Sequence, residues 1–586
     1  MSYMQPGDSS KRLRLFTAFL VVATLAFGWK LVEFQVVRAA EINKVSKEKR
    51  SVTRTLPAVR GSILDSEGHV LARTVNRYDI NAAPINVAPI TRTVNGMDVT
   101  VSVEQQVAEL AAALDMTVED VAAKIQGTSN YASLKKNVDS ETYRTLQKLD
   151  IPWLYFDQKL SRVYPDGAVA GNLIGFVGVD GTPLAGIERQ YNSCLAGIDG
   201  QETFERGATD GIRIPNSAQV TQKAKNGSNV ILTINSDLQY FTQQVLVNTV
   251  NNLRADWASA VVVEAKTGNI LAAAEAPSVD PNKPSASAAA DRESRIFQAV
   301  FEPGSTMKTV TAATVVDQGK ANPESKVRAP YRIRLPWGSV IQDSHLHPTQ
   351  KLTLTGVLRD SSNTGIIQFG ALVDTETRYN YLRKFGVGEK TAVNFAGESA
   401  GLINKWQDWD KLTDKTSMFG QGIAVTPIQT AFFYQTIANG GVRLQPRLVA
   451  GCQDSSGNIT NTVSKPGVRA ISAATARSTI DMLEKVVEQG GIGRTAAVSG
   501  YRVAGKSGTA QIKDGKGYGY RYAISFIGMA PAEDPQYVVA VTVYKPRTVS
   551  NSIGATPPFK RIFEQVLRMY RVPPSTTKSA KIATEW

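Results

Sequence analysis

A long uncharged apolar stretch lies near the N-terminus of the chain. Leu15–Trp29 contains no charged residue, and the apolar character continues to Val37. At 1.5 Å per residue, a helix over residues 15–37 would be about 34 Å long, which is enough to cross a bilayer. This pattern predicts one transmembrane helix.

The charges beside this stretch predict its orientation. Lys11, Arg12 and Arg14 precede it within residues 1–14. The positive-inside rule therefore predicts a cytoplasmic leader and an extracytoplasmic body. The alternative is a cleavable signal peptide, because residues 37–39 resemble a processing site, but the apolar stretch is longer than the hydrophobic part of a usual signal peptide.

Mixed patterns follow between residues 38 and 225. Residues 60–72 read as a strand, a Glu-Gly turn and a second strand, which predicts a β-hairpin. Apolar residues at helical spacing over 103–126 and 141–149 predict helices, and the glycine-rich stretch 167–207 predicts turns. We expect residues 38–225 to form one α+β domain.

A second domain is predicted over residues 226–572. It opens with a strand over 230–234, a helix over 237–253 and a strand over 259–264. It closes with strands over 522–529 and 537–544 and a helix over 559–572. Strands at both ends with helices between them predict a sheet built from both ends of the domain. The polar tail, residues 573–586, is expected to be disordered.

Length and composition agree with this division. A chain of 586 residues is too long for one hydrophobic core, since cores stop growing near about 250–300 residues. With 42% hydrophobic and 20% charged residues, it is neither collagen-like nor wholly disordered. The formal charge of +14 is compatible with nucleic acid, an anionic envelope or a solvated surface. Because no nucleic-acid-binding module accompanies the charge, we expect no nucleic-acid partner.

Cysteine and histidine are scarce. Cys194 and Cys452 lie far apart in the sequence, so neither a disulfide framework nor a thiolate metal site is predicted, and we expect two buried apolar residues. The three histidines are His69, His345 and His347, of which the last two could face one side of a strand. This is a poor supply for zinc, and we expect no metal and no cofactor.

The first candidate catalytic element is Ser305-Thr306-Met307-Lys308. The Pro-Gly pair before it predicts a turn, and the following residues are compatible with a helix, so Ser305 would open that helix. A spacing of three puts Ser305 and Lys308 on one face, where an unprotonated lysine could take the hydroxyl proton. The helix N-terminus also offers backbone N–H groups to developing negative charge.

Two further elements follow in the chain. In Ser361-Ser362-Asn363 a hydroxyl could relay a proton to a leaving amine, and the amide could hold a substrate carbonyl. Lys506-Ser507-Gly508-Thr509 reads as part of a strand that carries a cation, two hydroxyls and a glycine for close approach. Together these residue types are suited to acyl transfer through a serine.

Each element alone has an ordinary structural explanation. Ser305 could be a helix N-cap, 361–363 a turn and 506–509 the end of a strand, and Ser46–Lys49 and Ser133–Lys136 match Ser-x-x-Lys by chance. The order of the elements, their spacings of 56 and 145 residues and their fitting contexts favour the joint catalytic interpretation. This three-part signature is typical of serine β-lactamases and penicillin-binding proteins.

The chain resembles a class B penicillin-binding protein over nearly its whole length. Beyond the three elements, its matches to the family's non-catalytic motifs are Arg60-Gly61, Asp65, Gly68, Leu71-Ala72, Arg162, Tyr164-Pro165, Gly175, Gly186, Glu188 and Gly197. The forms Phe-Glu-Pro-Gly-Ser at 301–305 and Ser-Ser-Asn-Thr-Gly at 361–365 are more similar to the cell-division (septal) branch than to the elongation branch.

The resemblance implies a fold and a set of partners. Residues 38–225 would form an α+β pedestal, and 226–572 an α/β transpeptidase domain, similar to serine β-lactamases, with an antiparallel sheet flanked by helices. The implied ligands are peptidoglycan stem peptides ending in D-alanyl-D-alanine and β-lactam antibiotics. The implied protein partners are a membrane glycan polymerase and other division proteins.

The resemblance also implies a role for each site residue. Ser305 would attack the penultimate D-Ala carbonyl with Lys308 as general base, while Ser361 and Lys506 would deliver a proton to the leaving D-Ala. Asn363 would hold the substrate amide. The remaining roles fall on the third element: Ser507, Gly508 and Thr509 would bind the terminal carboxylate, and the N–H groups of Ser305 and Thr509 would form the oxyanion hole.

Three alternatives stay open at this point. The chain could be an elongation-type transpeptidase, a D,D-carboxypeptidase or β-lactamase on the same catalytic fold, or a non-catalytic scaffold of the division machinery. The pedestal and the anchor argue against a simple hydrolase. The presence of every residue of the three elements argues against a pure scaffold.

Overall fold

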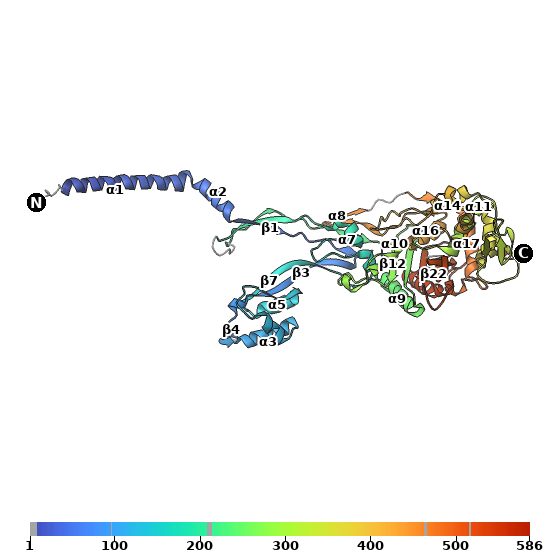
Figure 1. The fold of residues 1–586 in the computed structure, drawn as a ribbon, viewed down its shortest axis with the longest axis horizontal. Helices are drawn as coiled ribbons and strands as arrows, with labels where there is room; N and C mark the ends of the chain where they lie inside the picture. The colour runs from blue at the N-terminus through green and yellow to red at the C-terminus, as the bar shows by residue number, and fades with distance from the viewer. Residues whose placement is uncertain (1–8, 95, 208–213, 462–465, 515–516) are drawn as a thin grey trace. The chain divides into compact units, whose positions relative to one another are not determined.

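The computed structural model describes residues 9–94, 96–207, 214–461, 466–514 and 517–586 (Figure 1). The chain divides into two compact units. Unit 1 comprises Met1–Val59 and Gly197–Gly227, and unit 2 comprises Arg60–Ala196 and Ser228–Trp586. The domain limits expected from the sequence at residues 37, 225 and 572 stay predictions, and the first eight residues of the predicted leader lie outside the described part.

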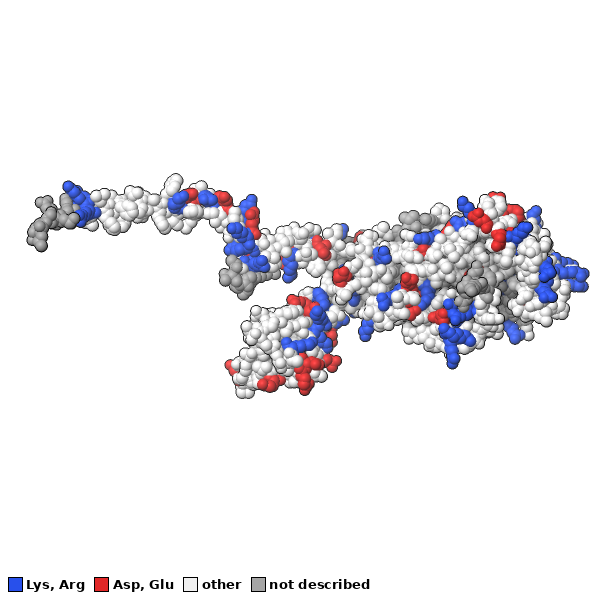
Figure 2. Space-filling model, in the orientation of Figure 1, with Lys and Arg blue, Asp and Glu red and all other residues white. Residues whose placement is uncertain are grey.

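Unit 1 begins with helix α1 (Ser9–Val32), a π-helical turn (Glu33–Val37) and α2 (Ala39–Arg50). The stretch Ser9–Val37 is long and apolar enough to cross a membrane, and none of it is buried against the protein, which confirms the predicted helix. Figure 2 shows it as a largely uncoloured rod with basic side chains at its start.

The rest of unit 1 is a small antiparallel sheet. Its middle strand is β8 (Gly200–Glu205), which pairs with β1 (Ser51–Leu56) on one side and β9 (Gln219–Gln222) on the other. Most of its side chains are exposed or half-buried, so the sheet has no large core of its own.

Unit 2 contains a seven-stranded sheet in which strands from distant parts of the chain meet. The predicted hairpin forms as β2 (Ile63–Leu64) and β3 (Val70–Ala82). Its other strands are β6 (Ala132–Val138), β7 (Leu154–Val163), β10 (Asn229–Leu232), β18 (Val449–Gln453) and β19 (Ile459–Asn461). Because β2 pairs in parallel with β10, which pairs with β18, the hairpin is joined to the C-terminal half.

A small helical lobe covers the far end of β3. Its elements are β4 (Ile90–Val94), β5 (Met97–Val101), α3 (Val103–Leu114), α4 (Val118–Lys124) and α5 (Ser140–Lys148). Their apolar side chains pack around Trp153, which is 1% exposed. The helices predicted over 103–126 and 141–149 are thereby confirmed, the first of them as two helices, because Asp115 adopts a left-handed conformation that ends α3.

The main body of unit 2 is built on a five-stranded antiparallel sheet. Its spatial order is β12 (Ile270–Ala276), β11 (Trp257–Glu264), β23 (Tyr537–Tyr544), β22 (Gly517–Ala530) and β21 (Ala504–Asp514). Strands from both ends of the predicted domain therefore share one sheet. Its last strand, β21, is an edge strand.

Helices cover both faces of this sheet, and the period-two alternation of a strand explains why. On β11, Val261 and Val263 pack into the core with α11 (Lys308–Asp317), α16 (Pro427–Ala438) and α17 (Ala473–Val487). Ala260 and Val262 face the other way, toward α9 (Ser236–Leu253) and α18 (Thr556–Met569). An antiparallel sheet with both faces buried accounts for the nearly continuous apolar run of β11.

Shorter elements complete the body. The helices are α6 (Gly171–Ile174), α7 (Gly186–Gln190), α8 (Asn192–Leu195), α10 (Arg295–Gln298), α12 (Leu354–Arg359), α13 (Asn363–Gly370), α14 (Thr375–Phe385) and α15 (Lys411–Thr416). The strands are β13 (Lys326–Ala329), β14 (Arg332–Arg334), β15 (Val340–Gln342), β16 (Gln350–Thr353), β17 (Val442–Arg443) and β20 (Val468–Arg469), which form two-stranded ribbons.

Residues of the pedestal motifs meet in one buried ionic cluster. The Glu188 carboxylate is fully buried and accepts from Arg60 Nε at 2.7 Å and from Arg162 Nε at 2.6 Å. The Tyr164 hydroxyl donates to the same carboxylate at 3.3 Å. Two guanidinium groups on one carboxylate compensate its burial, so these separated motifs form one structural unit.

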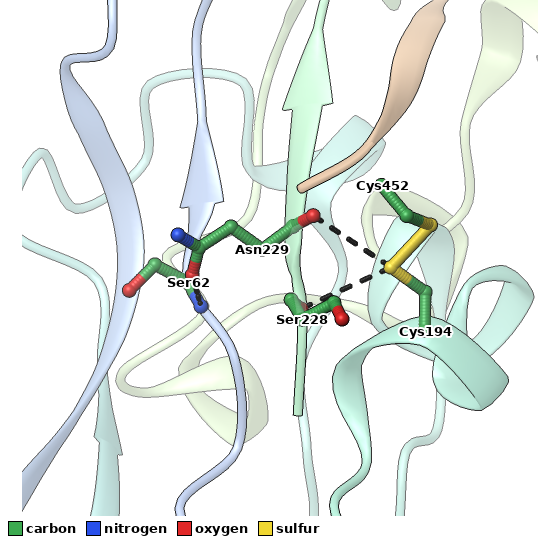
Figure 3. The surroundings of a disulfide bond; sticks show 5 residues. All are labelled: Ser62, Cys194, Ser228, Asn229 and Cys452. Carbon is green, nitrogen blue, oxygen red and sulfur yellow. Dashed lines mark hydrogen bonds between the residues drawn. A yellow bond between two sulfur atoms is a disulfide. The ribbon is translucent and has the colours of Figure 1, made fainter. Parts of the chain in front are cut away.

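The two cysteines correct the sequence prediction. They form a disulfide with Cα atoms 6.3 Å apart, and no free cysteine remains (Figure 3). Cys194 lies on α8, where its carbonyl oxygen accepts from Ser228 N at 2.9 Å. Cys452 lies on β18, opposite Val230 of the strand that follows Ser228. Strand pairing thus brings together residues separated by 258 positions, which sequence distance alone could not reveal.

The C-terminal tail also corrects the prediction of disorder. Strand β16 pairs with β13 on one edge, and the tail supplies partners for its other edge: Thr353 N donates to Thr584 O at 3.0 Å, and Trp586 N donates to Lys351 O at 3.1 Å. Glu585 pairs with Arg359 at 2.6 Å. The polar composition of the tail hid this, because the contacts are largely backbone hydrogen bonds.

Candidate active site

The Ser305 element forms one helical turn, as predicted. A 3-10 turn (Gly304–Met307) leads without a break into α11, and the Lys308 N–H donates to the Ser305 carbonyl oxygen. Residues three apart eclipse in such a turn, so Ser305 and Lys308 share a face. Ser305 is half-buried, whereas Lys308 is fully buried. Among the described residues the Ser305 hydroxyl has no hydrogen-bond partner, Lys308 included.

Ser361 is the point on which the three elements converge. Its Oγ lies 3.2 Å from Lys308 Nζ and 2.9 Å from Lys506 Nζ. The Lys308 amine also donates to the Ser361 carbonyl oxygen. Ser361 has a φ of 59°, a left-handed conformation that is costly for a residue with a Cβ. The chain reverses here between α12 and α13, which turns the hydroxyl toward both amines.

Burial changes the protonation of the two lysines. It lowers the pKa of Lys308 to about 7, and the Asp343 carboxylate opposes this only in part. Burial and the neighbouring Lys308 charge lower the pKa of Lys506 well below its ordinary value. Both amines are fully buried and reach the same hydroxyl, so the lowered pKa of each favours the neutral form, which can accept a proton.

Strand β21 carries the third element along the edge of the five-stranded sheet. Lys506 and Ser507 are buried, and Thr509 is half-buried. The strand lies directly against the Ser305 turn, so closely that a Cβ on Gly304 would stand only 2.9 Å from Thr509 O. A Cβ on Gly508 would likewise meet Ser525 Oγ at 2.4 Å and Thr306 Cγ2 at 2.9 Å. Glycine at these two positions therefore permits the close approach that the site needs.

Asn363 is the first residue of α13, two positions after Ser361. Its Nδ2 donates to the Gln342 carbonyl oxygen at 2.8 Å, which fixes the orientation of the amide. Ser362 caps the same helix by accepting from Gly365 N at 2.9 Å. Residues 361–363 thus form the turn that leads into α13, and their catalytic role stays a prediction.

Asp343 is a buried residue of the site that sequence reasoning missed. Its carboxylate accepts from the Ser362 hydroxyl at 2.7 Å, from Thr364 N at 3.1 Å and from the Asn363 N–H. His347 Nε2 lies 3.0 Å from the same carboxylate. The sequence analysis weighed His347 only together with His345 as a possible metal ligand, and no local pattern pointed to Asp343.

The described residues contain no group of three or more His, Cys, Asp or Glu side chains placed to hold a metal ion. A hydroxyl on a helical turn, two buried amines joined by a second hydroxyl and an adjacent edge strand are the parts of a serine acyltransferase.

Comparisons with known proteins agree with that class. Residues 258–565 match the penicillin-binding protein transpeptidase domain, and residues 55–232 match the penicillin-binding protein dimerisation domain. The chain therefore belongs to the penicillin-binding proteins, within the class B group that combines these two domains. This confirms the family resemblance and the expected fold.

Relatives with the same two-part organisation cover nearly the whole chain. Penicillin-binding protein PbpB of Mycolicibacterium smegmatis is 34% identical over 95% of this chain and 89% of that protein. Peptidoglycan D,D-transpeptidase FtsI of Escherichia coli is 30% identical over 96% and 93%. The crystal structure of penicillin-binding protein 3 of Mycobacterium tuberculosis with aztreonam has a TM-score of 0.70 and 29% identity, covering 91% of this chain and all of that one.

Proposed function

We propose that this chain is a membrane-anchored peptidoglycan D,D-transpeptidase of the cell-division type, with Ser305 as its nucleophile. The observation that carries the proposal is the convergence of Lys308 and Lys506 on the Ser361 hydroxyl beside the Ser305 turn. The names of the relatives PbpB and FtsI support peptidoglycan as the substrate and division as the setting.

The acylation step uses the neutral amine of Lys308. Ser305 Oγ attacks the carbonyl carbon of the penultimate D-Ala while Lys308 accepts the hydroxyl proton. The terminal D-Ala leaves as an amine, and it receives a proton that passes from Lys308 through Ser361 Oγ. Lys506 stands on the other side of that hydroxyl and steers the transfer. The products are an ester on Ser305 and free D-Ala.

The surrounding groups orient the donor peptide. The oxyanion would lie between the N–H groups of Ser305 and Thr509, each donor worth about 3–4 kcal/mol in comparable acyl transferases. Ser507, Gly508 and Thr509 would face the terminal carboxylate, and the fixed Asn363 amide would hold the substrate amide. An acceptor amine on a neighbouring strand then attacks the ester, forms the crosslink and returns the proton to Ser305.

The N-terminal helix supports an assignment to the cell membrane. By the positive-inside rule, Lys11, Arg12 and Arg14 at its start support a cytoplasmic N-terminus and an extracytoplasmic catalytic unit. In this setting a membrane glycan polymerase and other division proteins are the expected partners, through the helix and the pedestal.

The test is intact-mass spectrometry after incubation with a penicillin. Wild type should gain one stoichiometric adduct and Ser305→Ala none. Ser133→Ala is the matched control: it alters a chance Ser-x-x-Lys match on β6, where residues three apart face opposite sides of the strand, so its adduct should persist. An adduct on Ser305→Ala, or none on folded wild type, would overturn the assignment. Rapid loss of the adduct would favour a β-lactamase instead.

A further inference from the structure

A tryptophan-lined pocket lies in unit 2 apart from the three catalytic elements. Its volume is about 470 Å³, and its walls include Trp337, Trp406, Gln407, Trp409, Asp410 and Lys411. Three of the seven tryptophans of the chain thus gather at one pocket. Trp337 is 38% exposed, although indole is among the side chains with the largest apolar surface to bury. Such surface kept open to solvent in a concave site indicates a ligand.

The walls combine aromatic faces with polar groups, some of which already have partners. Asp410 caps α15 by accepting from Thr413 N, and the Lys411 ammonium lies 6.0 Å from the centroid of the Trp337 ring. Trp409 is held by its Nε1–H, which donates to Asn404 O at 3.1 Å, and by the Tyr379 ring at a centroid distance of 6.0 Å. Two further residues of the lining, Thr375 and Asp414, are joined by a hydrogen bond of 2.6 Å that Asp414 accepts, and Asp414 also pairs with Arg378. Within the described residues, by contrast, neither the Gln407 amide nor Trp406 Nε1 has a hydrogen-bond partner.

This chemistry is suited to a saccharide ring. The C–H face of a pyranose stacks on an indole ring, and its hydroxyl and acetamido groups exchange hydrogen bonds with amide, carboxylate and ammonium groups such as Gln407, Asp410 and Lys411. The volume lies within the range of about 300–1,000 Å³ that is usual for small-ligand sites, whereas a protein partner generally meets a flatter and larger surface. Polar and charged side chains outnumber the three tryptophans in the lining, as a ligand rich in hydroxyl groups requires.

Both walls of the pocket lead directly to the catalytic elements. Trp337 lies in the turn between β14 and β15, and Gln342 at the end of β15 accepts from Asn363. On the other wall, α15 runs into the turn Gly420–Gly422, where Gly420 O accepts from Gly304 N at 3.0 Å and Gly422 N donates to Glu302 at 3.0 Å. Hydrogen bonds therefore link the chain segments that follow the pocket walls to Asn363 and to the residues just before Ser305.

We propose that this pocket binds a sugar ring of the glycan strand to which the donor or acceptor stem peptide is attached. The inference rests on the proposed function, because that function supplies a substrate whose peptide is covalently joined to a glycan. Because the stem peptide is covalently joined to the glycan, a ring held in this pocket would keep that peptide at the surface of the same protein. The pocket would orient the polymer, while the three elements carry out the chemistry.

The test measures binding of peptide-free glycan strands, prepared by enzymatic removal of the stem peptides, to the full-length protein in detergent. Tryptophan fluorescence should change on titration of wild type. Trp337→Ala and Trp406→Ala, which alter different walls, should each weaken binding about tenfold, as expected for truncating a central aromatic contact. Tyr240→Ala is the control, since Tyr240 is an exposed aromatic (54%) on α9 outside the pocket, and it should bind like wild type.

The outcomes separate this inference from the proposed function. If penicillin acylates Ser305 in wild type but the stripped glycan does not bind, the saccharide assignment fails alone, and a protein ligand for the tryptophans takes its place. Binding that survives in both tryptophan variants, each shown to melt like wild type, would overturn the pocket as the site. Should one variant fail to fold, the other tests the proposal from the opposite wall.

Discussion

At the scale of single residues, Lys308 sets the expected pH dependence of acylation. A general base acts in its neutral form, and burial lowers the pKa of this amine to about 7. The rate constant for acylation of Ser305 should therefore fall about tenfold per pH unit below pH 7 and level off above it. Stopped-flow acylation with a chromogenic cephalosporin from pH 5.5 to 8.5 measures this profile.

The matched variant is Lys308→Arg, which keeps a cation that does not lose its proton in this range. It should acylate slowly and without the inflection near pH 7. A wild-type profile that is flat over this range, or that keeps rising toward pH 10, would contradict Lys308 as the base.

Two substitutions of Ser361 can separate the cost of its backbone strain from the catalytic contribution of its hydroxyl. Its left-handed backbone, at a φ of 59°, costs about 1–2 kcal/mol for a residue with a Cβ and nothing for glycine. Ser361→Ala and Ser361→Gly both remove the hydroxyl between Lys308 and Lys506, so each should slow acylation by about 10²-fold or more. The free energy of unfolding of the glycine variant, however, should be about 1 kcal/mol higher than that of the alanine variant. Urea unfolding and acylation rates on the same two proteins check both parts, and fast acylation in either one would remove Ser361 from the proton path.

What the sequence could reveal at this scale was local. Ser305, Lys308, Ser361, Asn363 and Lys506 could be predicted as site residues because short motifs bring a residue type and its secondary structure together within a few positions. Asp343 was not, although it binds three groups of the Ser361–Thr364 turn, because its partners lie about twenty positions further along and only the fold brings them into contact.

At the scale of elements, the buried cluster around Glu188 should hold the pedestal motifs together. Glu188→Ala leaves the Arg60 and Arg162 guanidinium groups, 15% and 3% exposed, without their common carboxylate. Removing one member of a buried ion pair costs about 3–5 kcal/mol, so the free energy of unfolding should fall by that amount. Denaturant unfolding followed by tryptophan fluorescence measures it.

The control for this prediction is Glu564→Ala. Its carboxylate is 39% exposed and lies 4.0 Å from Lys560, an arrangement worth less than about 1 kcal/mol. Equal losses in the two variants would mean that the Glu188 cluster contributes no more than a surface pair.

Elements with a strong internal pattern were predictable, and those held by distant partners were not. The apolar period of α9 and the alternation of the hairpin that contains β3 are properties of their own segments. The C-terminal tail has no such pattern, and it is ordered by the free edge of β16, more than two hundred residues earlier in the chain. The same reason explains why two cysteines far apart in sequence were read as unpaired.

At the scale of the whole molecule, the disulfide between Cys194 and Cys452 joins two parts of unit 2 that are far apart in the sequence. It joins α8, which precedes the predicted transpeptidase domain, to β18 within that domain, and it closes a loop of 258 residues. A crosslink over so long a loop removes much conformational entropy from the unfolded chain. Loops of this size correspond to a stabilisation of about 3–5 kcal/mol.

Reduction should therefore lower the melting temperature of the wild-type protein by several degrees, because a loss of this size is large compared with the marginal stability of a folded chain. Calorimetry with and without a thiol reductant measures the shift, and free-thiol titration verifies that the bond has opened. The double variant Cys194→Ala/Cys452→Ala should melt near the reduced wild type and ignore the reductant. If the oxidised and reduced proteins melt together although two thiols have been released, the link does not stabilise the fold, and strand pairing between β10 and β18 alone would join the two parts.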